Sequence, residues 1–189
     1  MKMKNLVFLI FLILVYSCNK NEDETKINNK SATLTITANL EGEAGLSYED
    51  SFTKWKDLKS KNSDSYIYQT RFISWTGYAN ITELKIEKGI ITERNYEEYE
   101  EYWNVSNREI IDSYSEVNSG LGTHDKGAAL LTIDNLYNSC SEYLSVDPIT
   151  NTIYFNTETN GLMTFCGYNP KNCMDDCFIG INIISFIWI

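Results

Sequence analysis

The spacing of apolar and polar residues along this chain switches between two periods, and each period predicts its own element. Apolar side chains at every second position, rich in β-branched and aromatic residues, predict strands, whereas spacings of three and four predict helices. The predicted strands cover residues 32–40, 66–75, 81–86, 90–96, 152–156, 161–167 and 178–189. Helices that interrupt runs of neighbouring strands indicate an α+β fold, with a mainly antiparallel, twisted sheet and two helices packed on one face.

Both predicted helices begin at a residue that can cap the first turn. Ser47, with Asp50 three residues later, precedes a helix that has Phe52 and Trp55 on one face. Thr132 precedes the second helix, whose apolar residues follow the same spacing. They are Ile133, Leu136, Tyr137, Cys140 and Leu144. Each helix therefore presents an apolar stripe that can pack on the sheet.

The C-terminal segment, residues 178–189, is rich in β-branched and aromatic residues over its whole length. It is too short to cross a membrane as a helix, because a helical span needs roughly 20 apolar residues. A short apolar run of this kind is typical of a central strand, and we expect both of its faces to be buried.

The N-terminus has the pattern of an export signal. Lys2 and Lys4 precede an apolar run over residues 6–15. The motif Leu14-Val15-Tyr16-Ser17-Cys18 then resembles a bacterial lipobox, in which the cysteine is diacylated. Tyr16 departs from the small residue that most lipoboxes hold, so the alternative is an ordinary signal peptide followed by a chance cysteine.

The lipobox resemblance divides the chain into three parts. It implies that residues 1–17 are a signal peptide and that Cys18 is the lipidated first residue of the mature chain. Residues 18–31 are polar and aperiodic, which predicts a flexible tether. Residues 32–189 then form a single domain. The acidic triplet 22–24 resembles the surface-export signal of Bacteroidota-type lipoproteins, so we expect a lipid anchor in the outer membrane and exposure at the cell surface.

Composition narrows the class of protein further. With 43% hydrophobic and 22% charged residues, the chain has the composition of a globular protein. The formal net charge of −10 excludes nucleic acid as an expected partner, because binding a phosphate backbone needs clustered lysine and arginine.

Four cysteines remain when Cys18 is set aside. They are Cys140, Cys166, Cys173 and Cys177. An even number in an exported chain predicts two disulfides. The alternative is a zinc ion held by four thiolates, but such sites usually have two short Cys-x₂₋₄-Cys spacings and only 173–177 has one. A 140–166 bridge would join helix to strand while 173–177 closed a small loop, but the sequence leaves the pairing open.

The single histidine is the main candidate for acid–base chemistry. His124 lies beside Asp125, so it could act as a general base. No Gly-x-Ser-x-Gly elbow supplies a nucleophile, and the Gly-x-Gly at 120–122 follows no predicted strand. We interpret the segment as a flexible loop with an incidental histidine. No catalytic residue, metal site or cofactor is expected.

The most acidic part of the chain is residues 93–116. Eight carboxylates there face only Arg94 and Arg108, without the alternating spacing and glycine turn of a calcium loop. We interpret the segment as a solvated edge. Its aromatic residues would suit a protein or carbohydrate contact, because aromatic side chains dominate many binding surfaces. The three binding candidates are Tyr99, Tyr102 and Trp103.

The order of several motifs resembles a family of small bacterial lipoproteins of unknown function. The matching elements are the Trp55 helix, Ser65-Tyr66-Ile67-Tyr68, Ile86-Glu87-Lys88-Gly89-Ile90, Thr132-Ile133-Asp134-Asn135-Leu136-Tyr137 and Asn160-Gly161-Leu162. The resemblance covers roughly residues 50–189 and implies an α+β lipoprotein module without supplying a catalytic residue. The elements Cys166-Gly167-Tyr168 and 173–177 depart from the family pattern.

These observations favour a lipid-anchored, non-enzymatic binding or interaction module of the cell envelope, with a protein or glycan as its ligand. The alternative is a small hydrolase at the cell surface. A carboxylate-dependent hydrolase would place two Asp or Glu side chains about 5–9 Å apart in a pocket.

Overall fold

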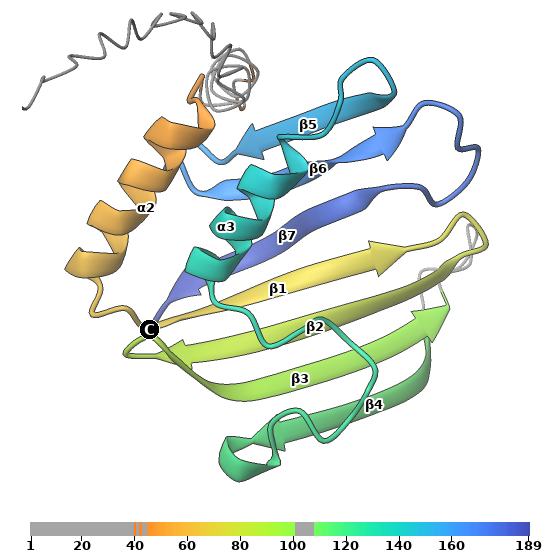
Figure 1. Ribbon diagram of the computed structural model, residues 1–189. Helices are drawn as coiled ribbons and strands as arrows, with labels where there is room; N and C mark the ends of the chain where they lie inside the picture. The colour runs from red at the N-terminus through yellow and green to blue at the C-terminus, as the bar shows by residue number, and fades with distance from the viewer. Residues whose placement is uncertain (1–39, 41, 43–44, 101–107) are drawn as a thin grey trace, which may run out of the picture.

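The structure is a computed structural model that describes residues 40, 42, 45–100 and 108–189. Its helices are α2 (Tyr48–Lys61) and α3 (Ile133–Tyr143), with a short 3₁₀ turn at Asn118–Gly120 (Figure 1). The strands are β1 (Tyr66–Ile73), β2 (Tyr78–Glu87), β3 (Ile90–Glu100), β4 (Glu109–Val117), β5 (Asn151–Thr157), β6 (Met163–Pro170) and β7 (Ile179–Trp188). The predicted α+β fold is confirmed.

The seven strands form one antiparallel sheet in the order β4-β3-β2-β1-β7-β6-β5. Strands β1 to β4 follow one another as a meander, and β5 and β6 form a hairpin. The last strand, β7, lies between β1 and β6 and joins these two halves.

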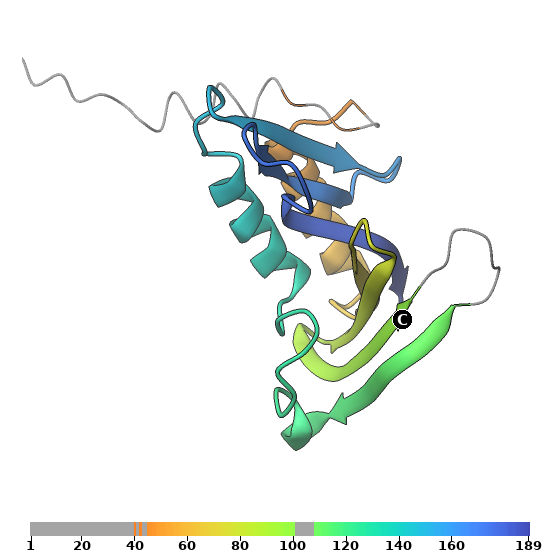
Figure 2. The same cartoon turned by 90° about the vertical axis from the view of Figure 1, so that its right-hand side faces the viewer.

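Both helices begin where the capping residues predict. The Ser47 hydroxyl accepts a hydrogen bond from the Asp50 amide. At α3 the Thr132 hydroxyl accepts from the Asn135 amide, and the Asn135 side chain accepts from the Thr132 amide, which completes a capping box. The two helices lie on the same side of the sheet (Figure 2). Within the described chain, neither helix is long and apolar enough to span a membrane.

The core lies between the helices and the sheet and is mostly aromatic and aliphatic. Trp55 of α2 and Tyr137 of α3 are fully buried against Tyr66, Tyr68 and Leu84 of the sheet. The helices cover the region around β1, β6 and β7, where these large side chains gather.

The other half of this sheet face is covered by residues 118–131, which we call the strap. It crosses in front of β2, β3 and β4 (Figure 1). Gly127 lies so close to the sheet that an added Cβ would sit 2.9 Å from the Tyr96 ring, and its φ of +89° also favours glycine. The Thr82 hydroxyl accepts from the Ala128 amide at 2.9 Å. The strap is therefore packed on the strands.

Two disulfides join the four cysteines. Cys140–Cys166 links α3 to β6, and Cys173–Cys177 closes the loop between β6 and β7. The predicted disulfides are confirmed, and the four sulfurs are bonded in pairs rather than gathered around a zinc ion.

The sequence prediction is wrong for two strands. In β7 only Ile181 and Ile183 are buried, while Ile184 and Ile187 are 43% and 54% exposed, because the helices pack on one face of the sheet only. Strand β4 was not predicted, since it carries acidic side chains and most of it is exposed. The expected signal peptide, the lipidation at Cys18, the tether and nearly all of the strand 32–40 lie outside the described residues.

Candidate binding groove

The sheet divides where β1 and β7 stop pairing. Their hydrogen-bonded register runs from Tyr66 opposite Trp188 to Thr70 opposite Ile183. Beyond that point β1 continues along β2 and β7 continues along β6. A hydrogen bond from the Asn182 side chain to the Arg71 carbonyl, at 3.3 Å, still bridges the two strands. The division leaves a groove of about 400 Å³ on the helix side of the sheet.

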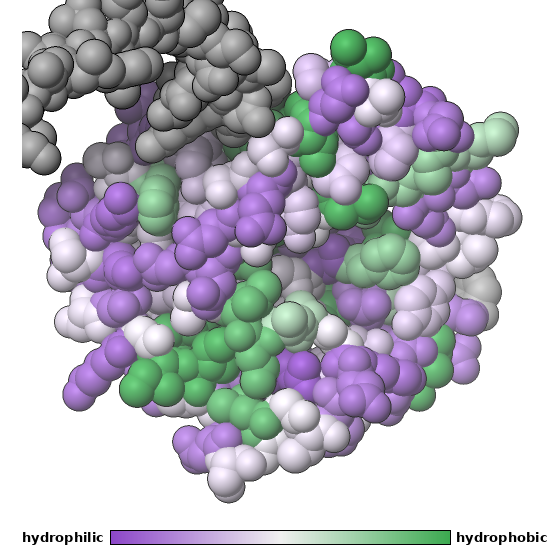
Figure 3. Space-filling model, viewed as in Figure 1, coloured by the Kyte–Doolittle hydropathy of each residue, from purple (hydrophilic) through white to green (hydrophobic). Residues whose placement is uncertain are grey.

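Three parts of the fold line the groove, namely helix α3, the strap and the sheet. Helix α3 contributes Leu136, Ser139 and Tyr143, whose spacing of three and four places them on one helical face. The strap contributes Ala128, Ala129 and Leu131. The sheet contributes Thr70, Phe72, Asn80 and Ile181. The same side of the molecule shows hydrophobic and hydrophilic surface intermixed in the space-filling view (Figure 3).

Tyr68 fixes the end of the strap beside the groove. Its hydroxyl donates to the Leu131 carbonyl, and burial raises the pKa of Tyr68 well above its ordinary value. The phenol therefore stays protonated and acts as a permanent hydrogen-bond donor. Among the described residues, the groove lining contains no carboxylate, histidine or cysteine.

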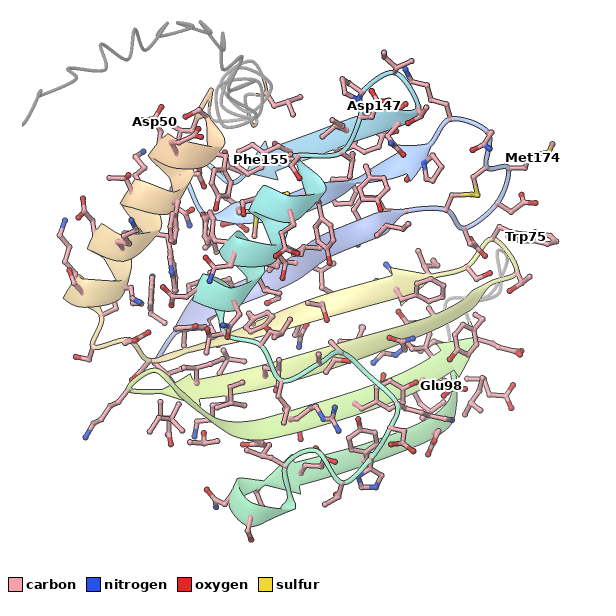
Figure 4. All side chains as sticks on the ribbon, viewed as in Figure 1. Asp50, Trp75, Glu98, Asp147, Phe155 and Met174 are labelled. Carbon is pink, nitrogen blue, oxygen red and sulfur yellow. A yellow bond between two sulfur atoms is a disulfide. The ribbon has the colours of Figure 1, made fainter. Side chains whose placement is uncertain are left out.

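A polar contact joins the β1–β2 turn to the loop that precedes β7. Asp176, in the Cys173–Cys177 loop, accepts hydrogen bonds from the Ser74 hydroxyl at 2.6 Å and from the Trp75 amide at 3.2 Å. Trp75 and Met174 project from this end of the molecule and are 68% and 93% exposed (Figure 4). The loop and the β1–β2 turn are thus joined into one tip.

Of the three binding candidates predicted on the acidic segment, the structure describes only Tyr99. Tyr99 is only 2% exposed and has the Arg108 guanidinium over its ring at 4.6 Å, so it is not an exposed contact residue. Tyr99 lies opposite the fully buried Ala79 of β2 and opposite Ile110 of β4. Tyr102 and Trp103 lie outside the described residues.

The acidic segment is also less solvated than predicted. Glu116 is buried in an ion pair with Arg94, whose Nε lies 2.8 Å from the carboxylate. The Arg94 hydrogen bond, reinforced by backbone amides of the strap, lowers the pKa of Glu116 far below its ordinary value. Glu98 and Asp112 share Lys126 at 2.8 and 2.9 Å. Lys126 comes from the strap, and local sequence gives no sign of this pairing.

His124 does not lie in a free loop, contrary to the sequence interpretation. Its ring stacks on Tyr114 with centroids 4.0 Å apart, and its Nδ1 lies 2.9 Å from Glu116. The His124 amide donates to the same carboxylate at 2.7 Å, and its carbonyl accepts from Arg94 at 2.8 Å. These contacts hold His124, which belongs to the strap, against β3 and β4.

The carboxylates that meet at Lys126 do not have the arrangement that the hydrolase alternative needs. Hydrogen bonding to Lys126 lowers the pKa of both Glu98 and Asp112. A glycosidase needs one carboxyl group with a raised pKa to donate a proton. Both groups are ionised at neutral pH, so neither is prepared as a general acid.

No family model, curated protein or solved structure matches this chain.

Proposed function

We propose that this protein is a lipid-anchored component of the cell envelope whose folded domain is a non-enzymatic binding module. The lipobox-like motif that ends at Cys18 supports attachment to a membrane, and the acidic triplet after it favours the outer membrane. The two disulfides support export, because such bonds persist in oxidising compartments.

The groove between β1 and β7 is the observation that carries the binding role. Its volume of about 400 Å³ lies within the range of small-molecule sites, roughly 300–1,000 Å³. Apolar walls with a few placed polar groups are the usual composition of such sites. The ligand is expected to be a glycan or a segment of protein from the cell envelope.

A pair of variants on α3 tests whether the groove binds. Ser139 lines the groove, so Ser139→Trp should fill it. Its neighbour Asn138 is exposed and does not line the groove, so Asn138→Trp is the matched control. The full-length proteins would be used to capture material from envelope extracts separated into polysaccharide and protein fractions.

We expect a species that both the wild type and Asn138→Trp retain and that Ser139→Trp loses. Capture that is the same for all three proteins would show that the groove is not the binding site. The test uses folded proteins only, checked by circular dichroism before capture.

A further inference from the structure

The polar groups that line the groove are neutral. Thr70 and Ser139 offer hydroxyls, and Asn80 offers an amide. Both kinds of group can donate and accept hydrogen bonds. The Asn182 side chain points to the opposite face of the sheet, because Asn182 alternates along β7 with the buried Ile181 and Ile183. The three groups come from two different walls, namely the β1–β2 pair and α3. A ligand in the groove therefore meets neutral hydrogen-bonding groups from both the sheet and α3.

The apolar part of the lining includes aromatic rings. Phe72 of β1 is 47% exposed and Tyr143 of α3 is partly exposed, so both offer ring surface to a ligand. Arg71 also borders the groove, but it alternates with Thr70 and Phe72 along β1. Its side chain therefore points toward the opposite face of the sheet. The lining thus combines aromatic surface with uncharged polar groups.

This combination disfavours several classes of ligand. A cation would find no carboxylate among the lining residues in the described part of the chain. A purely apolar ligand would bury the hydroxyls and amides without hydrogen-bond partners, which is unfavourable. A peptide strand would need a continuous free edge, but Asn182 already bridges to Arg71, and Asp176 bridges to Ser74.

We infer that the groove binds a neutral carbohydrate, and this inference rests on the proposed function as a binding module. Sugar hydroxyls match the neutral hydroxyls and amides, while the C–H faces of a sugar ring can pack on the aromatic side chains. The match is to a small ligand with polar and apolar surfaces side by side.

Trp75 extends this site beyond the groove. It follows Phe72 by three residues, its amide is held by Asp176, and its indole is 68% exposed at the tip. An indole at the end of the groove offers a further stacking surface for a longer chain. Trp75 should therefore contribute to the binding of an oligosaccharide more than to the binding of a disaccharide.

The direct test is calorimetric titration of the full-length protein in a zwitterionic detergent that contains no sugar. The probes are neutral hexasaccharides of glucose, mannose, xylose and N-acetylglucosamine, with an acidic galacturonate hexamer and a pool of uncharged hexapeptides for comparison. We expect at least one neutral hexasaccharide to bind with a Kd below about 1 mM. Ser139→Trp should weaken that binding at least tenfold, and Asn138→Trp should leave it unchanged.

Two further variants test the site without the Ser139→Trp substitution. Thr70→Val removes a lining hydroxyl without filling the groove and should weaken binding severalfold. Trp75→Ala should weaken the hexasaccharide more than the matching disaccharide. Equal losses of affinity for the hexasaccharide and the disaccharide would show that Trp75 is not part of the site.

The outcomes separate the carbohydrate inference from the proposed function. Binding of the peptides or of galacturonate alone, if Ser139→Trp abolishes it, would overturn the carbohydrate inference and leave a binding groove. Failure of every neutral hexasaccharide to bind also overturns the carbohydrate inference. Sugar binding that neither Ser139→Trp nor Thr70→Val changes would place the carbohydrate site elsewhere.

Discussion

The indole of Trp55 on α2 stacks on the indole of Trp188 at the end of β7, with ring centroids 5.5 Å apart and planes 9° from parallel. Trp55 is fully buried and also meets Tyr66 edge to face. Trp55→Ala should therefore lower the free energy of unfolding by about 3–5 kcal/mol. Trp75→Ala, at a largely exposed tryptophan, should change it by no more than about 0.5 kcal/mol. Urea unfolding of both variants checks the difference, and equal losses would contradict the packing described for Trp55.

The two disulfides should differ in their contribution to stability. Cys140–Cys166 spans 26 residues and Cys173–Cys177 spans 4. Because a longer closed loop restricts the unfolded chain more, Cys140→Ala/Cys166→Ala should cost about 3.5 kcal/mol and Cys173→Ala/Cys177→Ala about 2 kcal/mol. Denaturant unfolding of the two double variants measures this. Thiol counting on the denatured, unreduced wild type should find none of these four cysteines free.

Acid should weaken the contact between the strap and the sheet at Glu116. The pKa of Glu116 is lowered by folding, so its contribution is fully present above the unfolded pKa of about 4.5 and is lost as the pH falls toward the folded value. Glu116→Gln should therefore lower the melting temperature at pH 7 and should lose less further stability than the wild type between pH 5 and pH 2. The exposed Glu109→Gln is the control and should follow the wild type. Parallel melting curves for wild type and Glu116→Gln across this range would contradict the prediction.

Gly127 should tolerate substitution less well than another glycine with positive φ. A Cβ at Gly127 would crowd Tyr96, Tyr114 and Thr82, whereas at Gly45, with φ of +66°, it would meet nothing within 4 Å. Gly45→Ala should cost about 1 kcal/mol from backbone conformation alone. Gly127→Ala adds steric displacement of the strap and should cost at least about 2 kcal/mol. Chemical denaturation measures the free energy of unfolding of both variants. Similar losses would show that the strap can move away from the added Cβ at little cost.

Lipidation at Cys18 is tested by growing cells with labelled palmitate. The wild type should incorporate the label and Cys18→Ala should not, because a lipobox cysteine carries acyl chains on its sulfur and on its new N-terminus. Wild-type protein should also separate with the outer-membrane fraction. Equal labelling of the two proteins would exclude Cys18 as the anchor.

The elements that could be predicted from the sequence are those whose signals are local. Ser47 and Thr132 predict both helix starts, and the turn at residues 87–89 predicts the β2–β3 hairpin. Strand β4 gives no such signal, because its register with β3 pairs charged and polar residues such as Glu98 with Asp112. Its place at the sheet edge depends on β3 and the strap.

The groove could not be predicted, because its walls come from β1, α3, β7 and the strap. Leu136 appears in the sequence as an ordinary core position of a helix, and only the divergence of β1 from β7 leaves space beside it. The burial of Glu116 has a similar origin. Arg94 and His124 reach it from separate segments, so local charge counting predicts solvation where the folded chain has an ion pair.

The position of β7 also governs when the sheet can be completed. These ten residues follow all the other described strands in sequence, yet they form the only strand between β1 and β6 in the described sheet. Until β7 has been synthesised, the β1–β4 meander and the β5–β6 hairpin have no shared strand, and Trp55 lacks its stacking partner. A nascent chain therefore cannot complete this sheet before β7 has been synthesised. A premature stop before residue 179 would leave two separate pieces of sheet.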